Sequence, residues 1–194
     1  MPEIDEYYKT DELALSLVIA GIREIESHGL SDFSLRRVAS MCGVSCAAPY
    51  RHYKSKGDLI LAIISYVNSQ WELLQGQIVE SFRGDLRRQL IELCVANIRF
   101  WAANPNFRHI MLLDSCELDE RQKSEQARIY SVTRSLISEL CRENGIGEKE
   151  EARRALLARS TVLGVTHMLG SGELENSVET FSYIRKCFED IFSL

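Results

Sequence analysis

Side chains that bind phosphate are concentrated in one short stretch of the sequence, residues 31–56. It holds five basic residues against the single acid Asp32, a net charge of +4, in a chain of 194 residues whose net charge is -5. The basic residues are Arg36, Arg37, Arg51, Lys54 and Lys56. Tyr50 and His52 lie among them and can also donate hydrogen bonds to phosphate oxygens. The rest of the chain carries -9, so attraction to phosphate is confined to this region.

The residues in and around this basic stretch predict a helix-turn-helix. Ser34 caps a short helix over residues 35–42, and small Ala39 lets that helix pack closely against another. Gly43 can take the positive φ that a tight turn requires, and Ser45 then caps a second helix. The first turns of such a helix would lie in the major groove of DNA, where all four base pairs differ in their donors and acceptors.

Elsewhere, apolar residues recur at three- and four-residue spacing, which predicts an all-α protein without strands. Only three prolines interrupt the chain. One long helix should begin at Ser55, with Asp58 three residues on in a capping box. The other expected helices run from just after Thr10 to about His28 and then over residues 85–103, 106–115, 119–144, 149–170 and 177–192.

At the helix-turn-helix the sequence resembles a known family. Phe33-Ser-Leu-Arg-Arg-Val-Ala, followed by Gly43-Val-Ser-Cys-Ala-Ala-Pro-Tyr-Arg-His-Tyr-Lys-Ser-Lys-Gly-Asp-Leu59, is similar to the DNA-binding region of TetR-type transcriptional regulators. The similarity covers about residues 10–65. It implies a three-helix DNA-binding head, residues 1–56, and a larger helical-bundle domain for ligand binding and dimerisation, residues 57–194. The two would share the helix that begins at Ser55.

The resemblance also implies which residues contact DNA. The groove-facing start of the recognition helix would be formed by Ser45, Cys46, Ala47 and Pro49. Contacts to backbone phosphate would come from Tyr50, His52 and Lys56, and from Ser34 and Arg36 at the start of the supporting helix. The implied function is a homodimeric repressor that a small-molecule effector releases from a pseudo-palindromic double-stranded operator. Two alternatives stay open: a regulator that needs no ligand, and a helical small-molecule-binding protein or enzyme.

Three positions depart from the usual pattern of the family. Pro49 replaces an aliphatic residue, Tyr53 the commoner phenylalanine, and Gly57 a common glutamate. We expect Tyr53 to lie in the core, where its ring seals the head against the first helix. Cys46 and Ala47 offer few hydrogen bonds, so base recognition at these positions would depend on methyl contacts with thymine.

The larger domain contains aromatic and soft side chains that could line a ligand pocket. The candidates are Trp71, Phe100, Trp101, Phe107, Met111, Cys116, Tyr130, His167 and Met168. His109 and His167 have no partner carboxylate at a catalytic spacing. No Ser/His/Asp arrangement, phosphate-binding glycine loop or HExxH motif occurs in the sequence, so we expect no enzyme activity, cofactor or metal.

Two apolar seams near the C-terminus could form a subunit interface. One follows Ala155, Ala158, Val162, Val165 and Leu169, and the other follows Phe181, Ile184, Phe188 and Ile191. Two such helices from each subunit would make a four-helix contact and a homodimer. The alternative is that both seams are buried within their own domain.

Composition excludes several classes of protein. Hydrophobic residues make up 45% of the chain and charged residues 26%, as in an ordinary globular protein. No apolar run reaches the length of a membrane helix and the acidic start is unlike a signal peptide, so we expect a cytoplasmic protein without membrane contact. Six cysteines occur without a CxxC pair; Cys42 and Cys46 could meet across a helical turn, and a redox role for either stays open.

Overall fold

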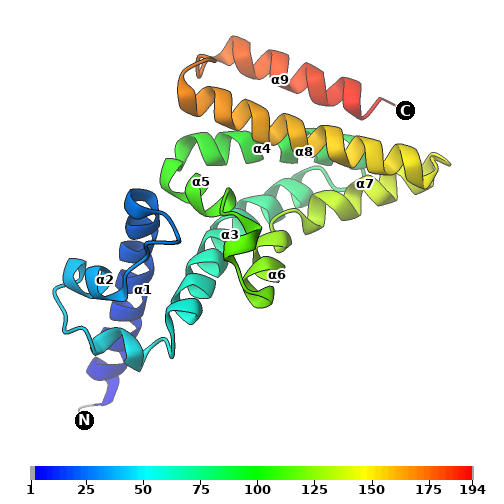
Figure 1. Cartoon of the computed structure of the whole chain (residues 1–194). Helices are drawn as coiled ribbons and strands as arrows, with labels where there is room; N and C mark the ends of the chain where they lie inside the picture. Colours follow the sequence, from blue (N-terminus) through cyan, green and yellow to red (C-terminus); the bar gives the residue numbers. More distant parts are fainter. Residues whose placement is uncertain (1–2, 194) are drawn as a thin grey trace. The chain divides into compact units, whose positions relative to one another are not determined.

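The computed structural model describes residues 3–193, and every regular element in that range is helical, as the sequence predicts (Figure 1). The chain divides into two compact units. The head unit comprises Met1–Ser69 and Asn106–Ala127, and the body unit comprises Gln70–Pro105 and Arg128–Leu194. These units are defined by packing, whereas the boundary predicted at residue 57 separates DNA binding from ligand binding, so that boundary stays a prediction.

The head unit is built around its first three α-helices. It contains α1 (Glu3–His28), α2 (Leu35–Met41), the 3-10 turn η1 (Ala48–Arg51), the first part of α3 (Lys56–Ser81), most of α5 (Pro105–Met111), η2 (Ser115–Glu117) and most of α6 (Glu120–Arg128). α1 ends where Gly29 takes a φ of 73° and its N–H donates to the Ile25 carbonyl. The Ser34 and Ser55 side chains cap the next two α-helices, as predicted.

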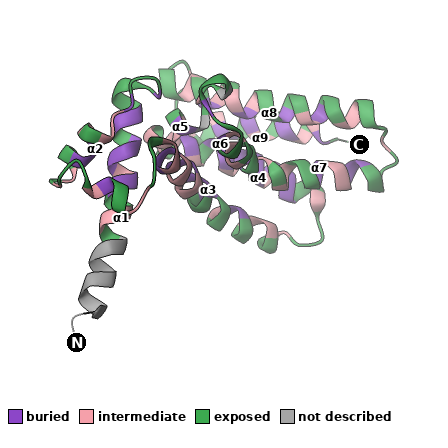
Figure 2. Cartoon of the chain, turned by 60° about the horizontal axis from the view of Figure 1, so that its bottom comes forward, coloured by how far each residue is buried: buried purple, intermediate pink, exposed green. Residues whose placement is uncertain are grey.

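The core of the head is apolar and closely packed. Val38, Ala39, Leu59 and Ile63 have no exposed surface, and they come from α2 and α3. A methyl group added at Gly21 of α1 would lie 2.5 Å from the Cδ1 atom of Ile63, so the Ile63 side chain would have to shift to accommodate it. The helices of each unit carry buried residues on one side and exposed residues on the other (Figure 2).

The segment predicted as one helix over residues 119–144 forms two. α6 ends at Arg128, and α7 (Ser131–Glu143) begins after a turn at Ile129 and Tyr130. The Ser131 hydroxyl donates to the Arg128 carbonyl over 2.7 Å, which satisfies an acceptor at the end of α6. Ile129 is buried within the turn. Neither glycine nor proline marks this break, so the apolar periodicity alone predicted a continuous helix.

The body unit is a helical bundle in which α4 (Leu86–Ala103) contacts α7, α8 (Glu148–Ser171) and α9 (Val178–Ile191). α8 and α9 run side by side (Figure 1). Trp71, Trp101 and Phe188 are fully buried in its core. Asp85 and Ser177 cap α4 and α9. Within residues 3–193, no helix combines the length and the apolar character needed to span a lipid bilayer.

Five of the nine residues in the two C-terminal seams are buried, and the other four, Ala155, Val165, Leu169 and Ile191, are partly exposed. Ala158, Val162, Phe181, Ile184 and Phe188 are all buried within the body unit. Their spacing therefore reflects packing inside the bundle, which is the alternative to a subunit interface. The exposed face of α8 instead carries Leu156, with 66% of its surface accessible.

Candidate functional site

The recognition segment, residues 44–52, is shorter and tighter than the α-helix predicted there. The only regular element in it is the 3-10 turn η1, whose N-cap is Ala47 and which has no side-chain cap. The prediction that Ser45 caps this element is wrong. The Ser45 backbone carbonyl instead accepts from the Ala48 N–H over 2.9 Å. Pro49 lies at the start of η1, has no N–H to donate, and accepts from His52 and Tyr53 through its carbonyl.

The turn before this segment has the geometry that the sequence predicts. Gly43 has a φ of 68°, in the left-handed region that glycine adopts without strain. Val44 follows, and its N–H donates to the Ala39 carbonyl over 3.0 Å. The recognition segment is therefore attached to the end of α2 by a hydrogen-bonded turn.

Most of the residues expected in the DNA groove face solvent. Ser45, Cys46 and Ala47 are exposed, whereas Pro49 is buried. Burial gives Pro49 a packing role in this structure. Cys42 and Cys46 are both free thiols. The exposed residues that were predicted to face bases thus offer a hydroxyl, a thiol and a methyl group.

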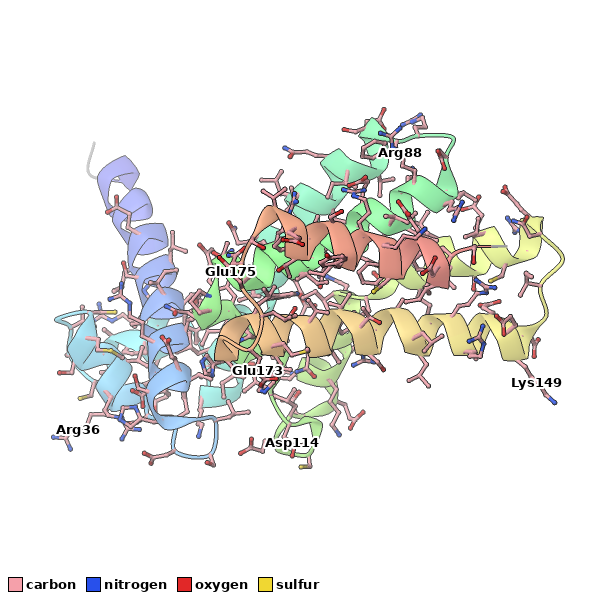
Figure 3. All side chains as sticks on the ribbon, turned by 90° about the horizontal axis from the view of Figure 1, so that it is seen from above. Arg36, Arg88, Asp114, Lys149, Glu173 and Glu175 are labelled. Atoms are coloured by element: carbon pink, nitrogen blue, oxygen red, sulfur yellow. The ribbon has the colours of Figure 1, made fainter. Side chains whose placement is uncertain are left out.

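The residues expected at phosphate surround the recognition segment. Arg36 extends outward from α2 (Figure 3), Tyr50 is 57% exposed, and His52 is partly exposed. Ser34 caps α2 through its oxygen, so its O–H proton remains available to an anion. Lys56 is also exposed, but its Nζ lies 3.4 Å from the Leu30 carbonyl.

A buried acid that sequence reasoning missed organises the start of α2. Glu24 of α1 is 2% exposed and accepts from the Ser34 N–H over 3.1 Å. Arg37 Nε lies 2.6 Å from the same carboxylate, and His28 Nδ1 lies 3.3 Å from its other oxygen. The Arg37 side chain is partly exposed, but its charge is paired with Glu24 and Asp32, so it is not part of the free basic surface. Glu24 falls at a position of α1 where the helical periodicity predicts an apolar residue. This placement is the signal that could have revealed its structural role.

Tyr53 has the structural role predicted for it. Its ring is partly buried, and its hydroxyl donates to the Ala14 carbonyl over 3.1 Å. Burial raises the pKa of this phenol, so it remains protonated and able to donate. The bond ties the end of the recognition segment to α1.

The beginning of α3 is bonded to α6 within the head unit. Gln122 Nε2 donates to the Gly57 carbonyl over 3.0 Å, and the Arg121 guanidinium lies 3.0 Å from Asp58 Oδ1. Gln122 is 4% exposed, and its Oε1 accepts from the Asp119 N–H. Any shift of α6 would therefore act directly on the first turn of α3, which follows the recognition segment.

The body unit contains a small pocket of about 70 Å³ between α4, α7 and α8. Its lining consists of Cys94, Asn97, Tyr130, Thr133, Arg134, Ile137, Ala155, Ala158, Arg159 and Val162. The residues from α7 and those from α8 each follow an i, i+3, i+4, i+7 pattern, which is the sequence signal for one helix face. Of the nine side chains predicted to bind a ligand, Tyr130 alone lines this pocket.

The other ligand candidates lie elsewhere. In the body unit, Phe100 packs against Trp71 in a tilted arrangement and against Trp101 edge-to-face, with ring centroids 5.6 Å and 4.9 Å apart. Phe107 packs edge-on against Tyr66 in the head unit. Cys116 is in the head unit and exposed, His167 is exposed, and Met168 is partly exposed. The side chain of Met111 lies outside the described part of the structure.

Comparison with known proteins gives a family match for residues 17–63 and fold matches over almost the whole chain. Residues 17–63 match the family model of bacterial regulatory proteins, tetR family. A TetR family transcription regulator from Marinobacter aquaeolei VT8 has a TM-score of 0.77 at 18% identity, covering 95% of this chain and 97% of that chain. No curated protein matches the sequence.

Two further solved structures have the same fold at lower identity. The fatty acid degradation regulator FadR from Bacillus halodurans has a TM-score of 0.72 at 15% identity, covering 93% of this chain and 94% of that chain. The transcriptional regulator FadR from Bacillus subtilis, solved with stearoyl-CoA, has a TM-score of 0.71 at 13% identity, covering 92% and 97%. The chain thus carries the N-terminal domain of the tetR family of bacterial regulatory proteins within the overall fold of TetR-family transcription regulators.

Proposed function

We propose that the chain is a homodimeric transcriptional repressor that binds a pseudo-palindromic operator in the cytoplasm and is released by a small-molecule effector. The observation that carries this proposal is the recognition segment, whose exposed Ser45, Cys46 and Ala47 are flanked by donors to phosphate at Arg36 and Tyr50. Phosphate contacts would position the head, and the exposed segment would contact base edges.

A dimer would present two recognition segments to one face of DNA. Half-sites separated by about 34–36 Å, or by a longer multiple of the helical turn, suit such an arrangement. The exposed face of α8, where small Ser160 and Gly164 follow Leu156, could pack closely against a second copy. On α9, Tyr183 is 65% exposed and would extend this contact. This face replaces the buried seams as the proposed interface.

Release by an effector needs a connection between the body pocket and the head. Tyr130 lines the pocket, and Ile129 alone separates it from the last residue of α6. At its other end, α6 holds the Gly57 carbonyl through Gln122. An effector that changes the turn at Tyr130 would move α6 and, through Gln122, the first turn of α3.

The DNA-binding part is tested by selecting bound sequences from a random pool with the full chain. We expect enrichment of an inverted repeat, and enrichment of no sequence would overturn the proposal. Operator affinity is then measured by fluorescence anisotropy with a panel of small acids, amines and aromatic compounds. A ligand that lowers the affinity supports release, whereas unchanged affinity with every compound that binds the body favours a regulator that needs no ligand.

The α6 connection has its own test. Gln122→Ala should bind the operator but lose much of its response to a ligand that releases the wild-type chain. The neighbouring Lys123→Ala is the matched control, because Lys123 forms its ion pair with Glu120 on the same helix. Equal responses of the wild type and Gln122→Ala would exclude this route.

A further inference from the structure

We infer that the pocket of the body unit binds a small organic carboxylate. This deepens the proposed function, on which it rests for its regulatory meaning, because it names the chemical class of the effector. Among the described residues, those that line the pocket include two arginines, Arg134 and Arg159, and no acid. Four further lining residues carry the argument, namely Asn97, Tyr130, Ile137 and Val162.

The two arginines give the pocket an uncompensated positive charge at its mouth. Both are exposed, whereas Asn97 and Val162 are buried, so the guanidinium groups mark the solvent side. Neither Arg134 nor Arg159 forms an ion pair with a described carboxylate. The three other arginines of α7 and α8, Arg142, Arg153 and Arg154, each do. A carboxylate fits the planar fork of guanidinium donors.

Arg159 is already oriented for this contact. Its guanidinium lies over the ring of Tyr130, 4.4 Å from the centroid. Stacking occupies the face of the guanidinium, and Arg159 also hydrogen-bonds the Tyr130 side chain, so its remaining N–H groups are available to a ligand. Tyr130 is partly buried, and this burial raises the pKa of its phenol, so it adds no negative charge to the pocket.

Asn97 adds a neutral hydrogen-bond donor to the pocket lining. Its side-chain oxygen accepts from Trp101 Nε1 over 2.8 Å. Indole nitrogen is only a donor, so this bond fixes the orientation of the amide and leaves the NH₂ group as the polar atom facing the pocket. Asn97 is 7% exposed, and its NH₂ group donates to no described acceptor. The NH₂ nitrogen is accessible at the pocket surface, where it can donate to an oxygen of a ligand.

The walls and the volume limit the rest of the ligand. Ile137, Ala158 and Val162 are apolar, and burial raises the pKa of the Cys94 thiol to about 12, which keeps it neutral. The volume is about 70 Å³. An apolar cavity of about 150 Å³ holds one benzene molecule. The pocket therefore suits a carboxylate with a body of a few carbon atoms, and a long acyl chain would not fit inside it.

The ligand class is tested on the full chain with three probes: butyrate, its neutral isostere butanamide, and inorganic phosphate. Saturation-transfer NMR and calorimetry should show binding of butyrate, with butanamide weaker by about tenfold or more because it lacks the charge. Phosphate should not compete, because it has no apolar body. Equal affinity for the amide or for phosphate, or no butyrate binding, would overturn the inference.

Variants locate the binding. Arg134→Gln and Arg159→Gln should each weaken butyrate binding by about tenfold or more. The matched control is Arg142→Gln, on the same helix as Arg134 but outside the pocket, which should bind like the wild type. Ala155→Leu should block binding by filling the pocket while both arginines remain, with helix content checked by circular dichroism. Wild-type affinity in both arginine variants would overturn the assignment.

The selection of DNA described above is carried out without any carboxylate, so the two proposals can fail separately. A chain that selects an operator but binds no butyrate would overturn only the ligand class. A chain that binds butyrate at Arg134 and Arg159 but selects no DNA would overturn the repressor and leave the carboxylate site intact.

Discussion

The carboxylate of Glu24 in α1 holds the guanidinium of Arg37 in α2, with 2.6 Å between Oε1 and Nε. The same oxygen accepts from the Ser34 N–H, one of the donors at the start of α2 that its own helix cannot satisfy. One buried acid thus fixes the helix that positions the recognition segment relative to α1. Its effect on DNA binding would be indirect, through the position of α2.

Glu24→Gln should therefore destabilise the head. The amide keeps one oxygen acceptor but loses its charge, and the free energy of unfolding should fall by about 1–3 kcal/mol. Urea unfolding followed by circular dichroism measures this change. Glu12→Gln is the matched control, because it makes the same chemical change at an exposed position of the same helix. Equal stabilities of the two variants would show that the Glu24 contacts contribute nothing.

The head could be predicted from sequence because its signals are local. Ser34 and Ser55 cap helices that begin within two residues of them, and Gly43 supplies a conformation that few other residues adopt. The length of the recognition helix could not be predicted in the same way. Ser45 and the helical spacing of the residues after it favour an α-helix. The structure instead has a single 3-10 turn, in which Pro49 is buried.

The pocket could not be predicted because its position depends on how helices pack. Ala155, Ala158 and Val162 form an apolar stripe that suits a subunit interface as well as an internal face. The sequence does not show which of these surfaces meets α4. Arg134 and Arg159 stand among many basic residues of two amphipathic helices, and folding alone brings them to one pocket.

Arg36→Ala should weaken binding to all DNA sequences to a similar degree. Arg36 projects into solvent from α2 and has no ion pair among the described residues, so a phosphate contact would be electrostatic and independent of sequence. The slope of log affinity against log salt should become shallower by about one unit. Lys149→Ala, at an exposed position of the body unit, is the control (Figure 3). A loss confined to one operator sequence would instead indicate base contact.

Asp58 should make stability depend on pH in the acid range. The Ser55 hydroxyl and then Arg121 hydrogen-bond to this carboxylate and hold its pKa below the ordinary value. A lowered pKa in the folded state means that the stabilisation is complete above the pKa of the unfolded chain and is lost as pH falls through the folded pKa. The stability difference between the wild type and Asp58→Asn should therefore be largest near neutral pH and shrink below about pH 4.

Urea unfolding at a series of pH values measures this difference. In a Ser55→Ala background, which removes the largest cause of the shift, the same Asp58→Asn change should have a smaller effect at neutral pH. A stability difference that does not vary with pH would mean that the ionised carboxylate has no special role at the start of α3.

The dimer interface is tested by placing charge on the exposed face of α8. Leu156 is 66% exposed and lies on the face of α8 that is proposed to contact the second copy, where a charge would be buried in the dimer. Leu156→Glu should therefore shift the chain from dimer to monomer in sedimentation velocity, while its helix content stays the same. Leu73→Glu, at a leucine of α3 that is 69% exposed, is the matched control and should leave the dimer intact.

Because each subunit would contribute one half-site contact, the monomeric variant should also bind the inverted repeat no better than a single half-site. A Leu156→Glu chain that remains dimeric would place the interface on another face of the body unit.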